Sequence, residues 1–177
     1  DWSSDVCSSD LWLIPRSGRL ATISASERER MRRLGLLPAS GRCDVVDLGV
    51  DEVFRPRDRF DDSTLEAVRA RYALPDRFLL YVGRLNERKN LPRLMHAALG
   101  CESITPDCPL VLVGAPDGKW SPSSGTDEAV NAGRVRFLGK VPSADLPAVL
   151  AMSSAFAFLS LDEGFGMPPL EAMASGI

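Results

Sequence analysis

Short apolar runs alternate with helical segments over the last two-thirds of the chain. The runs begin near Phe78, Pro109, Val135 and Ala155. Continuous apolar runs of this kind are typical of strands that are covered on both faces of a parallel sheet. Because parallel strands need a crossover between them, the alternation predicts a βαβ series. The pattern therefore favours an α/β fold, with a parallel sheet and helices on both of its faces.

Capping residues and apolar spacing predict where the helices begin. The segment Asp62–Tyr72 has its apolar residues on one face, and Ser63 and Glu66 form a capping-box pattern there. Asn90 precedes a segment with a clean apolar stripe and is expected to be its N-cap. Ser143 is expected to cap the helix before the last apolar run in the same way.

The first part of the chain predicts a smaller unit of the same kind. Strands are expected at Leu20–Ile23 and Cys43–Leu48. A charged helix between them is expected to begin at Ser24 or Ser26 and to end near Leu34. Its arginines could bind phosphate, but they alternate with glutamates, which favours a solvated helix face.

The first eleven residues differ from everything that follows them. The segment Asp1–Leu11 is rich in serine and aspartate and has no hydrophobic periodicity. Along its whole length it is similar to the translation of a common sequencing-library adapter. We therefore expect it to be a read-through artefact and exclude it from the fold, as is done for tags. The alternative is a natural disordered N-terminus.

A glycine loop (residues 160–167) between a strand and a helix carries the first candidate chemistry. In chain order, the loop and the start of the helix contain Glu163, Gly164, Phe165, Gly166, Met167, Pro168, Pro169 and Glu171. Glycines let backbone N–H groups approach a ligand, and a helix N-terminus favours phosphate. The two carboxylates suit hydroxyl groups instead, such as those of a sugar or a ribose. Phosphates and hydroxyls together indicate a sugar nucleotide.

A basic turn (residues 83–90) follows the strand that begins near Phe78. It places Arg84 and Lys89 between the end of this strand and the expected helix cap at Asn90. Ligands of open α/β sheets bind along the carboxyl edge of the strands, where this turn is expected to lie. The arginine fork and the lysine charge could together hold a diphosphate. The alternative is an ordinary solvated basic turn.

These two segments resemble the donor-site signatures of the retaining GT-B fold glycosyltransferases of family 4, the glycosyl transferases group 1. The spacing Glu163-x7-Glu171 and its flanks match one signature. The segment Tyr81–Leu85 with Lys89 and Asn90 matches the other. The alternative for the first signature is a buried strand, a turn and a helix whose acidic residues are placed for dipole reasons.

The resemblance extends from about Ser24 to Ile177 and implies a domain organisation. Residues 12–56 would be the end of an N-terminal acceptor domain and the linker. Residues 57–177 would be an incomplete, Rossmann-like C-terminal domain that binds the nucleotide-sugar donor. The chain would thus be a fragment of a GT-B enzyme, truncated on both sides. With the acceptor half absent, we expect no transfer activity from the chain alone.

The resemblance also implies a reaction and roles for named residues. The parent would be a hexosyltransferase, similar to mannosyltransferases, that moves a sugar from a nucleotide-diphosphate donor to an acceptor hydroxyl with retention. Arg84, Lys89 and Glu163 would be catalytic, because the cations would stabilise the leaving diphosphate and Glu163 would contact the transferred sugar. Glu171 would bind the ribose hydroxyls. The donor-binding candidates are Gly83, Arg84, Lys89, Lys140, Val141, Glu163, Gly164, Phe165, Gly166, Met167 and Glu171, with Lys140 and Val141 near the base.

Other functions stay open at this stage. A sugar-nucleotide epimerase can share the GT-B fold, although the basic turn argues against it. A nicotinamide-binding module needs Gly-x-Gly-x-x-Gly after its first strand, whereas Gly164-Phe165-Gly166 continues into prolines. A donor-binding fragment without activity is the remaining alternative.

Composition and charge bear on cofactors and partners. The 177 residues carry 21 basic and 24 acidic side chains, a net charge of −3, which gives no electrostatic case for nucleic acid. The 4 cysteines lack paired spacing and no Asp-x-Asp occurs, so no metal or other cofactor is expected. No apolar run approaches the roughly 20 residues that cross a bilayer. We expect a cytoplasmic enzyme whose partners are a nucleotide-diphosphate sugar and an acceptor glycan or lipid-linked sugar, with peripheral membrane association of the parent left open.

Overall fold

The computed structural model describes residues 14–116 and 126–177. The segment Asp1–Leu11, which we expect to be an artefact, lies outside the described residues. Internal contacts divide the chain into two compact units, Asp1–Gly49 and Val50–Ile177. The division falls inside the range 12–56, which the sequence assigns to the end of the first domain and the linker.

The first unit contains one parallel βαβ motif. It comprises a short 3-10 helix η2 (Ile14–Arg16), strand β1 (Leu20–Thr22), helix α2 (Ala25–Arg33) and strand β2 (Cys43–Val45). The strands run parallel with Leu20 opposite Cys43, and both are shorter than expected. Ser24 is the N-cap of α2, because its hydroxyl accepts a hydrogen bond from the amide of Glu27 at 3.1 Å.

The arginines of α2 form ion pairs on an exposed surface. Arg32 and Arg33 both pair with Glu29, and Arg30 lies within ion-pair distance of Glu27. Pairs three and four residues apart on a helix surface stabilise it by a few tenths of a kcal/mol, about 0.2–0.5 each. These contacts support the solvated helix face rather than a phosphate site.

The second unit is built on a parallel sheet of four strands. These are β3 (Leu79–Val82), β4 (Leu110–Val113), β5 (Val135–Gly139) and β6 (Ala155–Phe156), in the spatial order β5-β4-β3-β6. Leu79 pairs with Leu110 on one side and with Ala155 on the other. The last apolar run forms a shorter strand than expected, although the amide of Ala157 still donates to the carbonyl of Leu80 at 2.8 Å.

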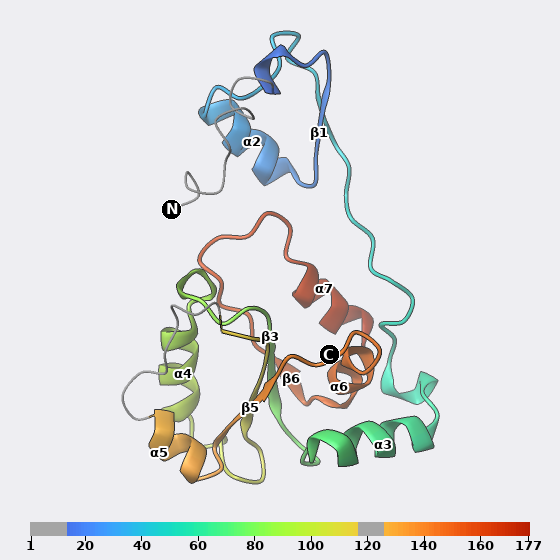
Figure 1. The fold of residues 1–177 in the computed structure, drawn as a ribbon, viewed down its shortest axis with the longest axis vertical. Helices are drawn as coiled ribbons and strands as arrows, with labels where there is room; N and C mark the ends of the chain where they lie inside the picture. Colours follow the sequence, from blue (N-terminus) through green and yellow to red (C-terminus); the bar gives the residue numbers. More distant parts are fainter. Residues whose placement is uncertain (1–13, 117–125) are drawn as a thin grey trace. The chain divides into compact units, whose positions relative to one another are not determined.

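Helices cover both faces of this sheet, as the sequence predicts. The helices are α3 (Asp62–Tyr72), α4 (Leu91–Leu99), α5 (Thr126–Asn131), α6 (Leu146–Met152) and α7 (Met167–Ala174), with 3-10 turns η3 (Arg57–Arg59) and η4 (Glu87–Lys89). In Figure 1, α4 and α5 lie on one side of the sheet and α3, α6 and α7 on the other. None of the helices in the described ranges is both long and apolar enough to cross a membrane.

The two faces of β3 belong to two separate hydrophobic cores. Leu80 and Val82 pack into one core with residues of α3, α6 and α7, whereas Tyr81 packs into the other with residues of α4 and α5. Leu80 and Tyr81 are fully buried. Burying a large apolar side chain contributes about 1.5–3 kcal/mol, so this strand holds the two layers of helices together.

Two of the expected helix caps are wrong. Helix α3 begins two residues earlier than the Ser63–Glu66 capping box requires, so Ser63 lies inside its first turn and Asp61 is the N-cap. Helix α6 has Asp145 rather than Ser143 at its N-cap, because the amide of Asp145 closes a turn onto the carbonyl of Pro142 at 3.0 Å. Neither N-cap residue makes a side-chain capping hydrogen bond.

The carboxylate of Asp145 serves a different contact from the helix cap. It accepts hydrogen bonds from Arg71 Nη1 and from the hydroxyl of Tyr72, both at 2.6 Å. These hydrogen bonds, first that from Tyr72 and then that from Arg71, hold the pKa of Asp145 below its ordinary value. The start of α6 is thereby joined to the end of α3.

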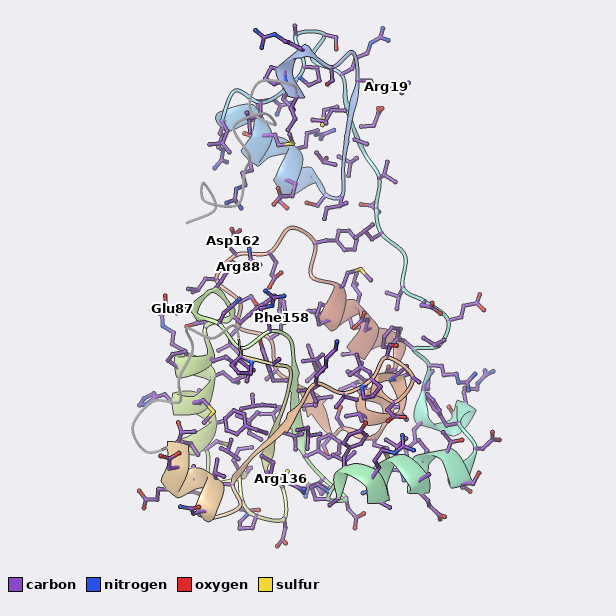
Figure 2. All side chains as sticks on the ribbon, viewed as in Figure 1. Arg19, Glu87, Arg88, Arg136, Phe158 and Asp162 are labelled. Carbon is purple, nitrogen blue, oxygen red and sulfur yellow. The ribbon has the colours of Figure 1, made fainter. Side chains whose placement is uncertain are left out.

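Two arginines of the β5 segment bind the carboxyl ends of neighbouring helices. Arg136 (Figure 2) donates to the carbonyl of Ala73 at 2.6 Å and to that of Tyr72 at 3.2 Å, just after α3 and at its end. Arg134 donates to the carbonyl of Leu99, the last residue of α4, at 2.8 Å. Cations near helix C-termini satisfy unpaired carbonyls and favour the helix dipole. The edge strand is thus fixed to a helix on each face.

Replacing Asp145 by asparagine tests the junction between α3 and α6. Because the folded pKa lies below the ordinary value of 3.8, the stability that this carboxylate adds is present above that value and is lost as pH falls through the lowered one. We expect Asp145→Asn to lower the free energy of unfolding at pH 7 by about 1 kcal/mol. Between pH 5 and pH 2 the variant should lose less stability than the wild type, measured by urea unfolding.

Asp76→Asn is the matched control, because the side chain of Asp76 is 97% exposed although it also pairs with an arginine. Exposed pairs contribute little, so we expect no measurable change. Equal losses in the two variants would contradict a special role for the Asp145 contact.

Candidate functional site

The order of the strands places a switch point beside β3. From β3 the chain moves outward through β4 to β5, and it then returns to place β6 on the opposite side of β3. Ligands of open α/β sheets bind outside the carboxyl ends of the strands at such a reversal. The basic turn follows β3 and the glycine loop follows β6, so both lie at this place.

The basic turn leaves the sheet through a tight contact between strands. The amide of Leu85 donates to the carbonyl of Ala115 at 3.0 Å and continues the pairing beyond β3 and β4. Gly114 has φ +144, and a Cβ atom there would lie 1.9 Å from the carbonyl oxygen of Gly83. Glycine is therefore required at this position, and the contact fixes where the basic turn begins.

The second half of the basic turn forms η4. The side-chain oxygen of Asn86 accepts a hydrogen bond from the amide of Lys89 at 3.2 Å and caps this turn. Asn90 then has φ 57 and is the N-cap residue of α4, but it makes no side-chain capping hydrogen bond. The expected cap position is confirmed, whereas the capping side chain belongs to Asn86 and acts one turn earlier.

The glycine loop ends at the first residue of α7. Gly166 is the N-cap residue, with φ 88, a conformation that glycine adopts without strain. Pro168 and Pro169 lie in the first turn and have no N–H group. Of the first three residues of this helix, only Met167 therefore has a backbone N–H that a ligand could bind. Any anion held here would therefore depend on the amides of the loop itself.

The two segments contact each other directly. Lys89 Nζ forms an ion pair with Glu163 Oε1. The amide of Leu161 donates to the carbonyl of Arg88 at 2.9 Å, and Lys89 Nζ lies 5.8 Å from the centre of the Phe158 ring. Figure 2 shows the side chains of Arg88, Phe158 and Asp162 in the region where the segments meet. The structure thus brings together two candidates that are 74 residues apart.

Arg84 has a different environment from Lys89. Its side chain is exposed. Within residues 14–116 and 126–177 it has no ion-pair partner. The carbonyl of Arg84 accepts a hydrogen bond from the hydroxyl of Tyr81 at 3.2 Å, which fixes the backbone at this residue. Of the two expected diphosphate-binding cations, one is therefore neutralised by a carboxylate and the other projects into solvent.

Tyr81 opens one of the matched signatures but is not a predicted site residue, and Phe158 is not identified from the sequence at all. Burial raises the pKa of Tyr81, and the nearby charge of Glu163 raises it further, so the hydroxyl keeps its proton. Phe158 offers its ring to Lys89, a contact that contributes about 0.5–2 kcal/mol to holding a cation. Both residues lie in apolar runs, where a packing role and a site role produce the same pattern.

Ser160 lies where the chain leaves β6 and enters the glycine loop. Its hydroxyl oxygen is inaccessible to solvent and has no hydrogen-bond partner in the part of the chain that the structure describes. Leaving such a group unpaired costs about 1–3 kcal/mol. Its position before Glu163 could have been noted from the sequence, but its burial could not.

Glu171 is half-buried on α7. Burial raises its pKa above the ordinary value. Unlike Glu163, it has no ion-pair partner among the residues described. The two acids of the Glu-x7-Glu spacing therefore differ, because Glu163 is neutralised by Lys89 and Glu171 is held in a partly desolvated place without a cation.

The remaining candidates are distributed around the same edge of the sheet. The carbonyl of Gly139, at the end of β5, accepts a hydrogen bond from the amide of Gly114 at 2.8 Å. Lys140 is exposed, whereas the side chain of Val141 packs in the core beside α3 and α6. Val141 could therefore meet a ligand only through its main chain. Half-exposed candidates are Gly83, Gly164, Phe165, Gly166 and Met167.

A surface hollow exists elsewhere, at the start of α3. It is lined by Arg57, Asp58, Phe60, Asp61, Asp62 and Leu65. Three carboxylates in one hollow would repel a diphosphate. The hollow is therefore not a candidate for the site expected at the carboxyl edge.

Comparisons with known proteins place the chain among glycosyltransferases. Residues 66–177 match the family described as Glycosyl transferases group 1. The chain is 33% identical over 165 residues to O-antigen chain mannosyltransferase B of Escherichia coli, covering 89% of this chain and 41% of that protein. It is 31% identical over 146 residues to the serotype-specific mannosyltransferase WbdA of Escherichia coli, covering 78% of this chain and 17% of that protein.

A solved structure shares the fold. Anabaena Alr3699/HepE in complex with UDP superposes with a TM-score of 0.72 and 22% identity, over 94% of this chain and 45% of that one. The chain thus spans less than half the length of each of these three proteins. Since the family matches more than half of the chain, over residues 66–177, the chain belongs to the glycosyl transferases group 1 and has the GT-B fold.

Proposed function

We propose that the parent of this chain is a retaining glycosyltransferase of family 4 that uses a nucleotide-diphosphate sugar and needs no metal ion. The observation that supports this most directly is the meeting of the basic turn and the glycine loop at the switch point of the sheet. One segment supplies cations and the other supplies carboxylates and backbone amides. A sugar nucleotide needs both kinds of partner, because it carries phosphates and hydroxyls.

In this proposal the diphosphate leaving group is stabilised by fixed charges. Arg84 projects from the end of β3 and Lys89 follows within the same turn. Positive charges already in place where negative charge develops lower the barrier without reorganisation of the site. The amides of Gly164 to Met167 would add partial positive charge from the glycine loop. This arrangement would perform the role that a divalent cation has in other transferases.

The carboxylates and the end of β5 have separate roles. Glu163 would contact hydroxyls of the transferred sugar, and Glu171 would accept hydrogen bonds from the ribose. The main chain of Lys140 and Val141 would lie near the base. Each of these roles follows from the resemblance residue by residue, and the placement of the residues at one edge of the sheet supports them.

A hexose donor, and mannose in particular, is supported by the names of the two Escherichia coli relatives. The acceptor would be a glycan or a lipid-linked sugar, met by the parent in the cytoplasm or at a membrane surface. The chain spans 41% and 17% of those relatives. We therefore expect the residues present here to bind the donor without transferring its sugar, because the family places the acceptor site in the N-terminal domain.

Donor binding is tested by saturation-transfer NMR of the chain with UDP-glucose, GDP-mannose and ADP-glucose. We expect wild-type protein to bind at least one of them. Arg84→Ala should weaken that binding by about tenfold, because a charge-assisted contact to phosphate contributes about 1.5–3 kcal/mol.

Arg77→Ala is the matched control for this experiment. Arg77 is exposed and lies just before β3, at the amino end of the strand, away from the switch point. Its removal changes the net charge equally and should leave binding unchanged. Equal losses in both variants would point to general electrostatic attraction, and an unaffected Arg84→Ala would contradict the assignment of Arg84.

Glu171→Gln should stabilise the fold while weakening nucleotide binding. The folded pKa of Glu171 is raised by burial, so stability falls as pH rises from the ordinary value of 4.5 through the raised one. At pH 7 the variant should therefore melt at a higher temperature than the wild type, and at pH 3.5 the difference should vanish. The change in nucleotide affinity is read from the same NMR titration.

Glu66→Gln serves as the control for Glu171→Gln, since Glu66 is exposed on α3. It should alter neither melting temperature nor binding. A Glu171→Gln variant with full affinity for the nucleotide sugar would show that this acid does not bind the ribose.

A further inference from the structure

Lys89 and Glu163 share one partly buried ion pair, although the proposed function gives them different parts of the donor. Only 12% of the Lys89 side chain and 23% of the Glu163 side chain are exposed. The cation proposed for the diphosphate is therefore neutralised by the acid proposed for the sugar. In this arrangement each of the two groups has the other as its charged partner.

The contacts around the pair keep Lys89 in place rather than Glu163. The Lys89 backbone is fixed by the hydrogen bond from its amide to Asn86, and its ammonium group lies over the Phe158 ring. Glu163 is half-exposed and lies next to Gly164 in the glycine loop. A glycine neighbour permits large changes of backbone angle at little cost. The carboxylate is therefore the partner that can move.

We propose that Glu163 is an internal counter-ion that the donor exchanges for its own diphosphate. This inference rests on the proposed function. When the donor binds, its diphosphate replaces the carboxylate at Lys89, and the released carboxylate accepts hydrogen bonds from hydroxyls of the sugar that will be transferred. Lys89 then has one anionic partner before binding and one after it.

The exchange discriminates between donor and product. A nucleoside diphosphate also displaces Glu163 from Lys89, but it brings no sugar hydroxyls, so the displaced carboxylate is left without a partner in a partly buried place. Burying an unpaired charge is costly. The intact sugar nucleotide compensates for the displacement and the nucleoside diphosphate does not. By competing for Lys89, Glu163 would favour release of the nucleoside diphosphate product. By binding the sugar hydroxyls, it would favour capture of the intact donor.

The test is calorimetric titration of wild type and Glu163→Gln with three matched pairs of ligands, UDP with UDP-glucose, GDP with GDP-mannose and ADP with ADP-glucose. In the pair that the wild type binds, we expect Glu163→Gln to bind the nucleoside diphosphate about fivefold more tightly, because Lys89 is no longer neutralised. Affinity for the sugar nucleotide should stay constant or fall. The preference for sugar nucleotide over nucleoside diphosphate should therefore decrease by at least about fivefold.

Glu87→Gln is the matched control. Glu87 is exposed on η4 in the same basic turn and has no role in the ion pair, and Figure 2 shows its side chain near Arg88. The substitution removes the same unit of charge from the same region. We expect both affinities to stay within about twofold of wild type, which separates the exchange from a general rise in positive potential.

A second readout needs no ligand. Lys89 should react slowly with an amine-acylating reagent in the wild type and faster in Glu163→Gln, measured by mass spectrometry against the exposed Lys140 as internal reference. If Glu163→Gln does not fold, Glu163→Asp keeps the charge, shortens the side chain and should give intermediate values in both measurements.

The outcomes are distinct. A wild-type chain that binds none of the three pairs of ligands overturns the proposed function and the exchange together. Binding by the wild type with an unchanged or weakened affinity of Glu163→Gln for the nucleoside diphosphate overturns the exchange alone. An unchanged reactivity of Lys89 in Glu163→Gln overturns it as well, since the lysine would then not be held by the carboxylate.

Discussion

The burial of β3 on both faces is the constraint on which the second unit depends. Its residues alternate between two hydrophobic cores, so the strand cannot shift by one position without exchanging every side chain between them. The strand also has neighbours on both sides, β4 and β6. A strand fixed in this way determines where its carboxyl end lies, and the basic turn begins at that end.

Charge is distributed unevenly around this end of the sheet. Lys89 is covered and compensated, whereas Arg84 stands in solvent, so the two cations differ in how readily they meet an incoming anion. The acids differ as well, because Glu163 has a cation as its partner whereas Glu171 is partly desolvated without one among the residues described. In the proposed function these asymmetries would order the steps of binding, with attraction by the exposed arginine first and contact with the covered lysine afterwards.

The sequence predicts those features that depend on local patterns. Apolar runs identify β3 and β4, and the stripe after Asn90 identifies α4. The caps at Ser63 and Ser143 are wrong because capping residues compete with neighbours that only the fold supplies: Asp145 occupies the N-cap position while its carboxylate binds Arg71 and Tyr72. The Lys89–Glu163 pair could not be predicted either. The sequence shows the motif that contains each residue, but no local pattern predicts a contact between residues 74 positions apart.

The contact between Gly83 and Gly114 limits which positions of the basic turn can carry different side chains. No side chain fits between these two backbones, so the point from which the basic turn departs is set by main-chain atoms alone. Residues farther along the turn face no such restriction. Chains with this architecture can therefore diversify their ligand preference by exchanging side chains downstream of a fixed anchor, without rebuilding the scaffold that carries them.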